Sequence, residues 1–424
     1  MRVFLSFTSV VLLLLVVLLA GAVAWLIFTR QPYEQPFRPD APQYGQRGDY
    51  DVGYQSFTIP DSDRPLKIWV WYPSADATEP ALYSEFNGIF EVSGVATRDA
   101  IPLSDDAPYP LVIFSHGNGS SPLLSTFYNE HLASHGFVVV GIEHNGNTVL
   151  DRLLGSDRFN DLSRDHYIYR PNDVTQAIDY ALETLNTGAL DGMIDPDRIA
   201  VSGHSFGGYT AFASAGANFD FEALTAYCEA TGDTSLGDVR DEAQLVEWMR
   251  DLPIVGGVCS LEDNAERYAE LAGLETIPDG TWNIFGDERI NAIVAQAPFN
   301  APIFGEDQLS QITMPSMILV GSNDSTTYPE RDAYNFYEWL GSDTKYLAEF
   351  VLGDHSMFID FCPPALTNAG FFTSCSDPVW DLGRAHDITN HLATAFLRSI
   401  YYDDAEAQSA LDTVDFVGLR IRQP

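Results

Sequence analysis

The sequence predicts an α/β fold in which a mostly parallel central sheet carries helices on both faces. After Pro110, short continuous apolar runs alternate with longer segments of helical periodicity, which is typical of parallel strands joined by crossover helices. Before Pro110, two runs alternate between apolar and polar residues in the manner of an antiparallel pair. We therefore expect an antiparallel start to the sheet, followed by parallel strands.

The expected elements follow one another along the chain. The antiparallel pair is predicted at 52–59 and 66–72, and the buried strands at 111–114, 137–142, 199–202, 292–295, 317–320 and 346–352. Helices are predicted at 124–134, 174–185, 209–215, 330–340 and 388–400.

Composition indicates a globular chain, and we predict one large domain over residues 51–424. Of the 424 residues, 46% are hydrophobic and 19% are charged, which is enough apolar material for a sizeable core. The 60 acidic residues outnumber the 22 basic ones and give a formal net charge of -38. Such a surface repels phosphate backbones, so we expect no nucleic-acid partner.

The N-terminus carries the clearest topological signal. Residues 3–28 are almost wholly apolar, long enough to span a bilayer and longer than the apolar centre of a typical cleaved signal peptide. We predict that residues 1–30 form a transmembrane anchor, with a cleaved signal segment as the alternative. The domain is then expected outside the cytoplasm, in the periplasm or at the cell surface, or secreted if the segment is cleaved.

Two further segments depart from the strand and helix rhythm. Residues 31–50 are rich in Pro, Gln, Arg and Gly and are predicted to be a linker. Residues 218–290 are acidic and helix-prone, and they follow the helix at 209–215. We predict that they form a helical cap over the active site.

Four cysteines fit an exported protein, because an even count outside the cytoplasm favours disulfides. Three pairings are possible, and we predict the nearest-neighbour one, Cys228 with Cys259 and Cys362 with Cys375. The alternative is four free thiols in a cytosolic protein. A metal site is not expected, because the close C-x-x-C spacing is missing.

The strongest chemical motif is Gly203-His204-Ser205-Phe206-Gly207-Gly208, read directly after a predicted strand and before a helix. This context is that of a nucleophile elbow, a sharp turn that lifts a serine hydroxyl above the sheet edge. The glycines Gly203 and Gly207 allow the turn to close, and the helix N-terminus favours developing negative charge at Ser205. The alternative is an ordinary glycine-rich turn.

A serine hydroxyl needs a histidine base and an acid, which follow in the order serine, acid, histidine in this kind of fold. His355 lies in a polar turn after the strand at 346–352, so we predict that it is the base. His386 and His391 fall on or beside the last helix and are expected to be surface or packing residues.

The acid is predicted at Asp324, because the strand at 317–320 runs directly into it. Its competitors are Asp332, on the following helix, and Asp354, next to the base and expected to shape a turn. A turn or helix cap is also the alternative role for Asp324.

Negative charge on a tetrahedral intermediate requires hydrogen-bond donors. One is predicted to be the backbone N–H of Phe206, the residue after the nucleophile. The other is predicted in the loop after the strand at 111–114, at Asn118 with Gly117 in reserve. His116 is expected to be a structural residue of this loop.

Several short motifs together resemble the plasma-type platelet-activating-factor acetylhydrolases and bacterial dienelactone-hydrolase-like esterases, within the α/β-hydrolase superfamily. The motifs are Phe114-Ser115-His116-Gly117-Asn118-Gly119, the run at 132–137, Glu143-His144 and the elbow at 203–208. The runs Asn145-Gly146-Asn147-Thr148 and Arg170-Pro171-Asn172-Asp173 are similar to the bacterial branch. The resemblance implies an α/β-hydrolase fold and calcium-independent serine esterase chemistry with no cofactor.

These observations predict a serine-dependent carboxylic-ester hydrolase that works through an acyl-enzyme. The expected partner is a small-molecule or lipid ester with a short or medium acyl group, with short-chain or oxidised phospholipids among the candidates, beside the membrane that holds the N-terminal segment. A serine peptidase on the same fold and a catalytically inactive binding protein are the alternatives.

Overall fold

The computed structural model describes residues 16, 17, 21, 38–60, 64–76, 79–85, 90–154, 157–231, 258–362 and 376–423. The predicted membrane segment at 3–28 lies almost wholly outside these residues, so the anchor stays a prediction. Among the helices that the structure describes, none combines the length and apolar character needed to cross a membrane.

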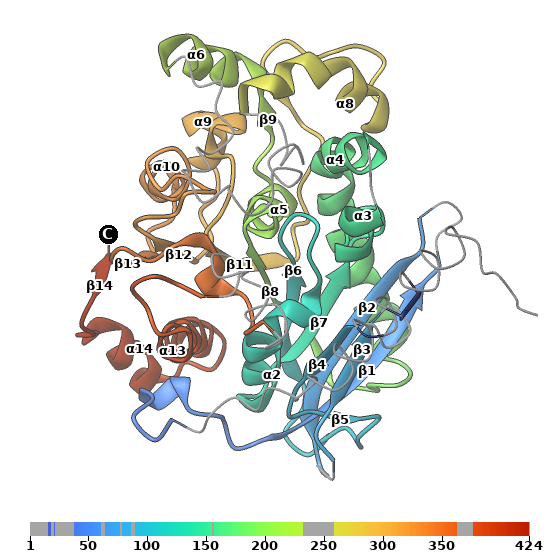
Figure 1. The fold of residues 1–424 in the computed structure, drawn as a ribbon, viewed down its shortest axis with the longest axis vertical. Coiled ribbons are helices and arrows are strands. Elements are labelled where there is room, and N and C mark those ends of the chain that lie inside the picture. The colour runs from blue at the N-terminus through green and yellow to red at the C-terminus, as the bar shows by residue number, and fades with distance from the viewer. Residues whose placement is uncertain are drawn as a thin grey trace, which may run out of the picture.

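A mixed, mostly parallel sheet of ten strands forms the centre of the domain (Figure 1). In spatial order the strands are β14 (Leu419–Arg422), β13 (Lys345–Phe350), β12 (Ser316–Gly321), β11 (Ile290–Gln296), β8 (Ile194–His204), β6 (Tyr109–Ser115), β7 (Val138–Glu143), β2 (Leu66–Ser74), β1 (Asp51–Ile59) and β5 (Thr97–Arg98). Neighbours from β13 to β7 run parallel, whereas β14, β2 and β1 join antiparallel. The predicted fold is therefore confirmed.

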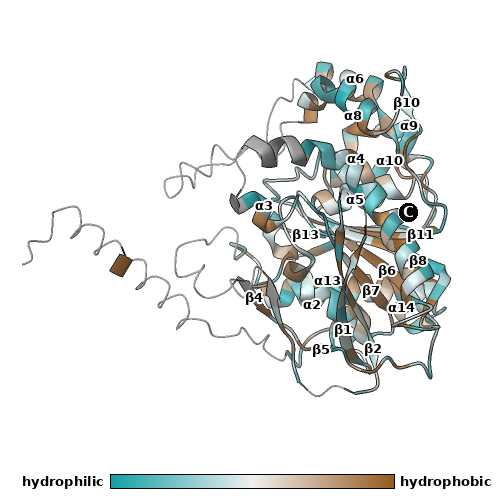
Figure 2. Cartoon of the chain, turned by 90° about the vertical axis from the view of Figure 1, so that its right-hand side faces the viewer, coloured by the Kyte–Doolittle hydropathy of each residue, from teal (hydrophilic) through white to brown (hydrophobic). Residues whose placement is uncertain are grey.

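The central strands are buried on both faces, as their continuous apolar sequences predict. Every residue of β6 and of β12 is buried. Because side chains alternate along a strand, Ile113 packs into one hydrophobic core while Val112 and Phe114 pack into the other. Figure 2 shows apolar residues along these strands and hydrophilic ones on the outer helices.

Helices cover both faces of the sheet (Figure 1). One face carries α2 (Thr126–Ser134), α13 (Leu382–Tyr401) and α14 (Ala405–Asp412). The other carries α4 (Asp157–Tyr180), α5 (Phe206–Ser214), α9 (Gly305–Leu309) and α10 (Ala333–Trp339).

The helix α4 begins well before the predicted start at residue 174, and Pro171 lies inside it. Proline has no N–H, so the carbonyl four residues earlier, on Tyr167, loses its helical partner. The hydroxyl of Tyr209, on α5, donates to that carbonyl at 2.7 Å. A tertiary contact therefore supplies the hydrogen bond that the proline cannot donate.

The described part of the predicted linker, residues 38–50, packs against the domain. Arg38 forms ion pairs with Asp381 and Asp387, at 2.7 Å and 2.8 Å. The N–H of Tyr44 donates to Nδ1 of His391, and its carbonyl contacts Nε2 of His131. The folded unit thus begins earlier than the predicted boundary at residue 51, because buried histidines satisfy this segment's backbone.

The insertion at 218–290 extends the helical layer beside α4. Its described elements are β9 (Phe219–Asp220), α6 (Phe221–Thr231), η5 (Val258–Asn264), α8 (Ala265–Leu271) and β10 (Thr281–Trp282). The predicted disulfide between Cys228 and Cys259 is confirmed and joins α6 to η5. Arg267 of α8 pairs with Asp165 of α4 at 2.9 Å. A position over the active site stays a prediction, as does the Cys362 pairing, because Cys375 lies outside the described residues.

Glu130 fastens the early strands to α2. Its buried carboxylate accepts hydrogen bonds from the Tyr83 hydroxyl at 2.6 Å and from the amides of Val95 and Ala96, at 2.9 Å and 3.0 Å. Tyr83 lies on β3 (Leu82–Glu85), which pairs with β4 (Phe90–Ser93).

Replacing Glu130 by alanine should lower the free energy of unfolding by about 2–3 kcal/mol, because three buried donors lose their acceptor. Glu130→Gln should lose less, since its amide oxygen still accepts. Urea unfolding of both variants measures the difference. Equal losses in the two variants would contradict the role assigned to these hydrogen bonds.

Candidate active site

Ser205 occupies a strained turn between β8 and α5. Its backbone has φ 59° and ψ -117°, a left-handed φ that non-glycine residues rarely adopt. The Ser205 N–H donates to the carbonyl of Gln296, on the neighbouring strand β11, at 2.8 Å. The turn thus has the strand–turn–helix geometry that a nucleophile elbow requires, and a hydrogen bond to β11 holds it in place.

The elbow glycines are required by close backbone approach. A Cβ at Gly203 would collide with the carbonyl of Gly207, and a Cβ at Gly207 would collide with the carbonyl of Ser115. Both positions therefore have no room for a side chain, and the second brings the elbow against the loop after β6.

His355 and Asp324 meet at the same edge of the sheet. Asp324 follows β12, and His355 begins the short helix η7 (His355–Phe358) that follows β13. These strands are parallel neighbours, so both loops emerge on one side. Nδ1 of His355 lies 2.8 Å from Oδ2 of Asp324, so the structure brings together the two side chains predicted as base and acid.

Four donors fix the Asp324 carboxylate. Oδ1 accepts from the amides of Thr326 and Thr327, at 2.8 Å and 2.7 Å. Oδ2 accepts from the Thr327 hydroxyl at 2.8 Å as well as facing His355. Sequence reasoning missed Thr327, because only the folded turn places its hydroxyl against the carboxylate.

The two competing carboxylates have other partners. Asp332 forms an ion pair with Arg331 at 2.6 Å and accepts from the amide of Asn300 at 2.8 Å. Asp354 accepts from the amide of His355 at 2.7 Å and so caps η7, which is the turn role expected for it.

His355 lies beside the elbow. Its ring centroid is 4.6 Å from that of His204, the residue before Ser205, and Nε2 of His204 lies 3.3 Å from the carbonyl of His355. Within the described residues, the Ser205 hydroxyl makes no hydrogen bond to His355. Such contacts are often long in ligand-free enzymes and tighten when substrate binds.

The loop at 116–119 approaches the elbow from β6. A Cβ at Gly117 would lie 3.4 Å from the Cβ of Ser205, so this loop lies close to Ser205. The amides of Asn118 and Phe206 have no acceptor among the residues that the structure describes. Both predicted oxyanion donors are therefore unpaired beside Ser205.

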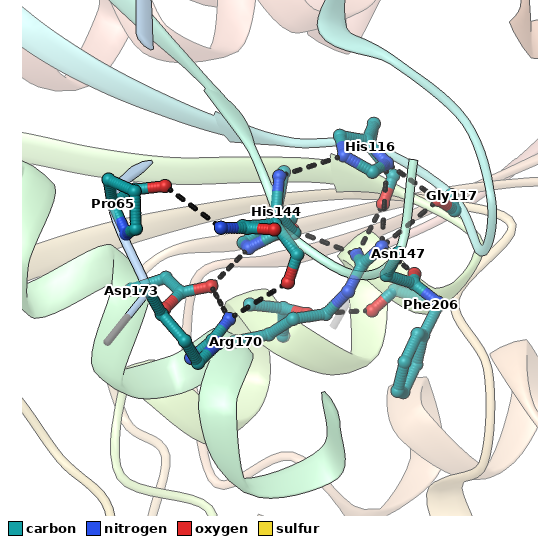
Figure 3. A network of polar contacts seen from close by, with 12 residues as sticks. Pro65, His116, Gly117, His144, Asn147, Arg170, Asp173 and Phe206 are labelled. Carbon is teal, nitrogen blue, oxygen red and sulfur yellow. Dashed lines mark hydrogen bonds and ion pairs between the residues drawn. The ribbon is translucent and has the colours of Figure 1, made fainter. Parts of the chain in front are cut away.

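A buried polar network lies behind this loop (Figure 3). Arg170 donates to the carbonyls of His116 and Gly117, and Asp173 contacts His144 at 2.8 Å. His116 is structural, as expected, and accepts from the amide of His144 at 3.2 Å. The sequence motifs contained these residues, but nothing in the sequence showed that they meet.

The other two late histidines are packing residues. His386 stacks on Phe127 with ring centroids 3.7 Å apart, and His391 accepts from the amide of Tyr44. Both are buried. Among the described residues, no group of three or more His, Cys, Asp or Glu side chains is arranged to hold a metal ion.

Two opposing effects set the charge of His355. Burial disfavours the imidazolium, but the Asp324 carboxylate and its hydrogen bond outweigh burial, so the pKa of His355 is raised above its ordinary 6.5. Burial lowers the pKa of the neighbouring His204 well below that value. The two neighbouring histidines therefore differ in pKa: the Asp324 carboxylate raises that of His355, whereas burial keeps His204 a neutral imidazole.

NMR titration of the His355 ring should give a pKa above 6.5, and Asp324→Asn should lower that pKa, because the largest effect that opposes burial is then removed. The raised pKa means that this pair stabilises the fold below about pH 6.5 and that the stabilisation is lost as pH rises through the folded pKa. An unchanged titration in Asp324→Asn would show that the carboxylate does not act on His355.

Comparison with known proteins finds similarity to platelet-activating factor acetylhydrolases over part of the chain. Residues 89–169 match the family described as "Platelet-activating factor acetylhydrolase, isoform II". The platelet-activating factor acetylhydrolase of Canis lupus familiaris is 30% identical over 143 residues, covering 26% of this chain and 32% of that protein. The enzyme of that name from Cavia porcellus is 25% identical over 216 residues, covering 38% of this chain and 50% of that protein.

Two further similarities extend the comparison. The "Uncharacterized peptidase YuxL" of Bacillus subtilis is 30% identical over 133 residues, covering 31% of this chain and 18% of that protein. A ferulic acid esterase from Streptomyces cinnamoneus superimposes with a TM-score of 0.57 at 18% identity, over 91% of this chain and 98% of that one. The matched segments span half or less of each curated relative. The chain therefore has the α/β-hydrolase fold, and its residues 89–169 are similar to the acetylhydrolase family.

Proposed function

We propose that this chain is a serine-dependent carboxylic-ester hydrolase that works through an acyl-enzyme. The proposal rests on one arrangement: Ser205 on a strained elbow, beside the His355–Asp324 pair and two unpaired amides. Candidates for the three roles of nucleophile, base and oxyanion donor lie at one edge of the sheet, which supports acyl transfer as the reaction.

The reaction follows from these positions. His355 takes the proton of the Ser205 hydroxyl as its oxygen attacks the ester carbonyl, and Asp324 stabilises the imidazolium. The amides of Asn118 and Phe206 donate to the carbonyl oxygen as it becomes negative. The intermediate collapses, His355 gives its proton to the leaving alcohol, and a water activated by His355 then releases the acid and restores Ser205.

The proposed substrate is an ester with a short or medium acyl group, including short-chain or oxidised phospholipids. The similarity to acetylhydrolases over residues 89–169 supports a short acyl group. The net charge of -38 favours neutral or zwitterionic esters over anionic ones, because like charges repel.

We also propose that the enzyme acts outside the cytoplasm, next to a membrane. The apolar run at 3–28 supports an anchor, and the disulfide between Cys228 and Cys259 suits an oxidising compartment. A serine peptidase is the second candidate, because one relative bears a peptidase name and the same arrangement can cleave amides.

Ser205→Ala should abolish hydrolysis of p-nitrophenyl acetate and labelling by a fluorophosphonate probe, because both reactions need the serine oxygen. Circular dichroism should show the fold retained, since the substitution removes one atom from a turn. Residual hydrolysis at the wild-type rate would exclude Ser205 as the nucleophile, and absent labelling of the wild type would favour an inactive binding protein.

A series of p-nitrophenyl esters from acetate to palmitate should give the highest kcat/KM at short or medium chain length. Peptide p-nitroanilides serve as the comparison, because amide cleavage distinguishes the second candidate. A preference for the longest chains would contradict the acyl range, and turnover of amides without esters would reverse the assignment in favour of a peptidase.

A further inference from the structure

We propose that Arg170 and Asn147 are positioning residues that orient the amide donors of the loop at 116–119. The inference rests on the proposed function, because it concerns the donors that would bind the oxyanion. Neither side chain reaches the reacting atoms; both act through the backbone of this loop.

Arg170 contacts two consecutive peptide groups of the loop (Figure 3). Its Nη1 donates to the carbonyl of His116 at 2.5 Å, and its Nη2 donates to the carbonyl of Gly117 at 3.1 Å. The side chain is completely buried, so no water competes for these carbonyls from solvent.

These contacts fix the direction of the N–H groups that follow. A trans peptide is planar, and its N–H points opposite to its C=O. Holding the carbonyl of Gly117 toward Arg170 therefore turns the N–H of Asn118 away from Arg170. The same argument applies to the His116 carbonyl and the N–H of Gly117, so one guanidinium orients both the predicted donor and its reserve.

Asn147 also forms hydrogen bonds with the loop at 116–119. Its Nδ2 donates to Oδ1 of Asn118 at 2.7 Å, and its Oδ1 accepts from the amide of Gly119 at 3.3 Å. The same oxygen accepts from Nη2 of Arg170 at 2.5 Å. The side chain of Asn118 and the next amide are thus engaged, which leaves the Asn118 N–H as the unpaired group.

Arg170 also contacts the second donor residue. Its guanidinium lies over the ring of Phe206, 4.6 Å from the centroid. The N–H of Phe206 is the other predicted oxyanion donor. One side chain therefore contacts the loop that carries the first predicted donor and the residue that carries the second.

A buried chain of hydrogen bonds anchors this arrangement. Nδ1 of His144 lies 2.8 Å from Asp173, and Nε2 of His144 lies 2.9 Å from the hydroxyl of Ser115. The hydroxyl of Ser115 is also 3.3 Å from Nη1 of Arg170. An imidazole that donates to Asp173 accepts from Ser115, which in turn accepts from Nη1 of Arg170, so these three contacts form one continuous chain.

Ser115, His144 and Asp173 have the connectivity of a catalytic triad but are completely buried. A substrate cannot reach the Ser115 hydroxyl, which also lies in the strand β6 rather than on a strained turn. These three residues therefore hold Arg170 against the loop at 116–119 through hydrogen bonds. Ser205 remains the serine proposed for acyl transfer.

The geometry requires an arginine at residue 170. Burial lowers its pKa to about 9, so the side chain stays a cation at neutral pH. Only a planar guanidinium presents two parallel donors to neighbouring carbonyls while its face lies on an aromatic ring. A lysine retains the charge but loses this fork.

The test compares Arg170→Lys and Asn147→Ala with a control, Arg398→Lys. Arg398 also pairs with a carboxylate, Asp404 at 2.8 Å, and donates to a carbonyl, that of His135 at 3.1 Å, but it lies on α13, away from the loop. Each protein is assayed for kcat and KM with p-nitrophenyl acetate, for inhibition by a trifluoromethyl ketone, and for its unfolding midpoint.

Arg170→Lys and Asn147→Ala should each lower kcat about tenfold to a hundredfold with little change in KM, because misplaced donors weaken only the transition state. The trifluoromethyl ketone forms a tetrahedral adduct with an oxyanion, so its affinity should fall by a similar factor. Arg398→Lys should change the unfolding midpoint without a matching loss of kcat or of inhibitor affinity.

Losses no larger than those of Arg398→Lys, or losses confined to KM, would overturn the inference. If Arg170→Lys does not fold, Asn147→Ala decides the question alone, since it leaves the buried cation in place. Ser205→Ala separates the two proposals: activity retained there rejects the esterase assignment, whereas activity lost there but retained in Asn147→Ala rejects only the positioning role.

Discussion

The left-handed backbone of Ser205 is the constraint on which the rest of the site depends. A side chain held at positive φ is costly, and the turn persists because its amide is bound to Gln296 and its glycines fit against neighbouring backbone. The same close approach of Gly207 to Ser115 brings the loop after β6 close to Ser205. The strained turn at Ser205 and the contact between this turn and the loop after β6 therefore depend on each other.

The parallel sheet assembles the site from distant sequence. Adjacent strands β8, β11, β12 and β13 end at one edge, so the loops that carry Ser205, Asp324 and His355 emerge together. Hydrogen bonds then select among similar side chains. Four donors converge on Asp324, whereas Asp332 is neutralised by Arg331 and Asp354 caps a helix, so only one nearby carboxylate is oriented toward the imidazole.

The apolar runs in the sequence predicted the buried strands. The candidate residues Ser205, Asp324 and His355 were recognised because each follows the end of a strand. Sequence reasoning failed where a residue's hydrogen-bond partner lies far away in the sequence. The helix predicted at 174–185 begins much earlier, and the Tyr209 hydroxyl supplies the donor that Pro171 lacks inside it. Residues 38–50 were predicted to be a linker, but buried histidines bind their backbone. Thr327 and Arg170 were missed for the same reason: their function comes from which groups the fold brings near them.

The contact between Tyr209 and the carbonyl of Tyr167 has a consequence for mechanical behaviour. Tyr209 belongs to the helix that begins at the elbow, and Tyr167 lies one turn before Arg170. This hydrogen bond thus ties the helix that begins at Phe206 to the helix that carries Arg170. Because Tyr167 and Tyr209 are both completely buried, substitutions on the exposed surface leave this link between the two helices in place.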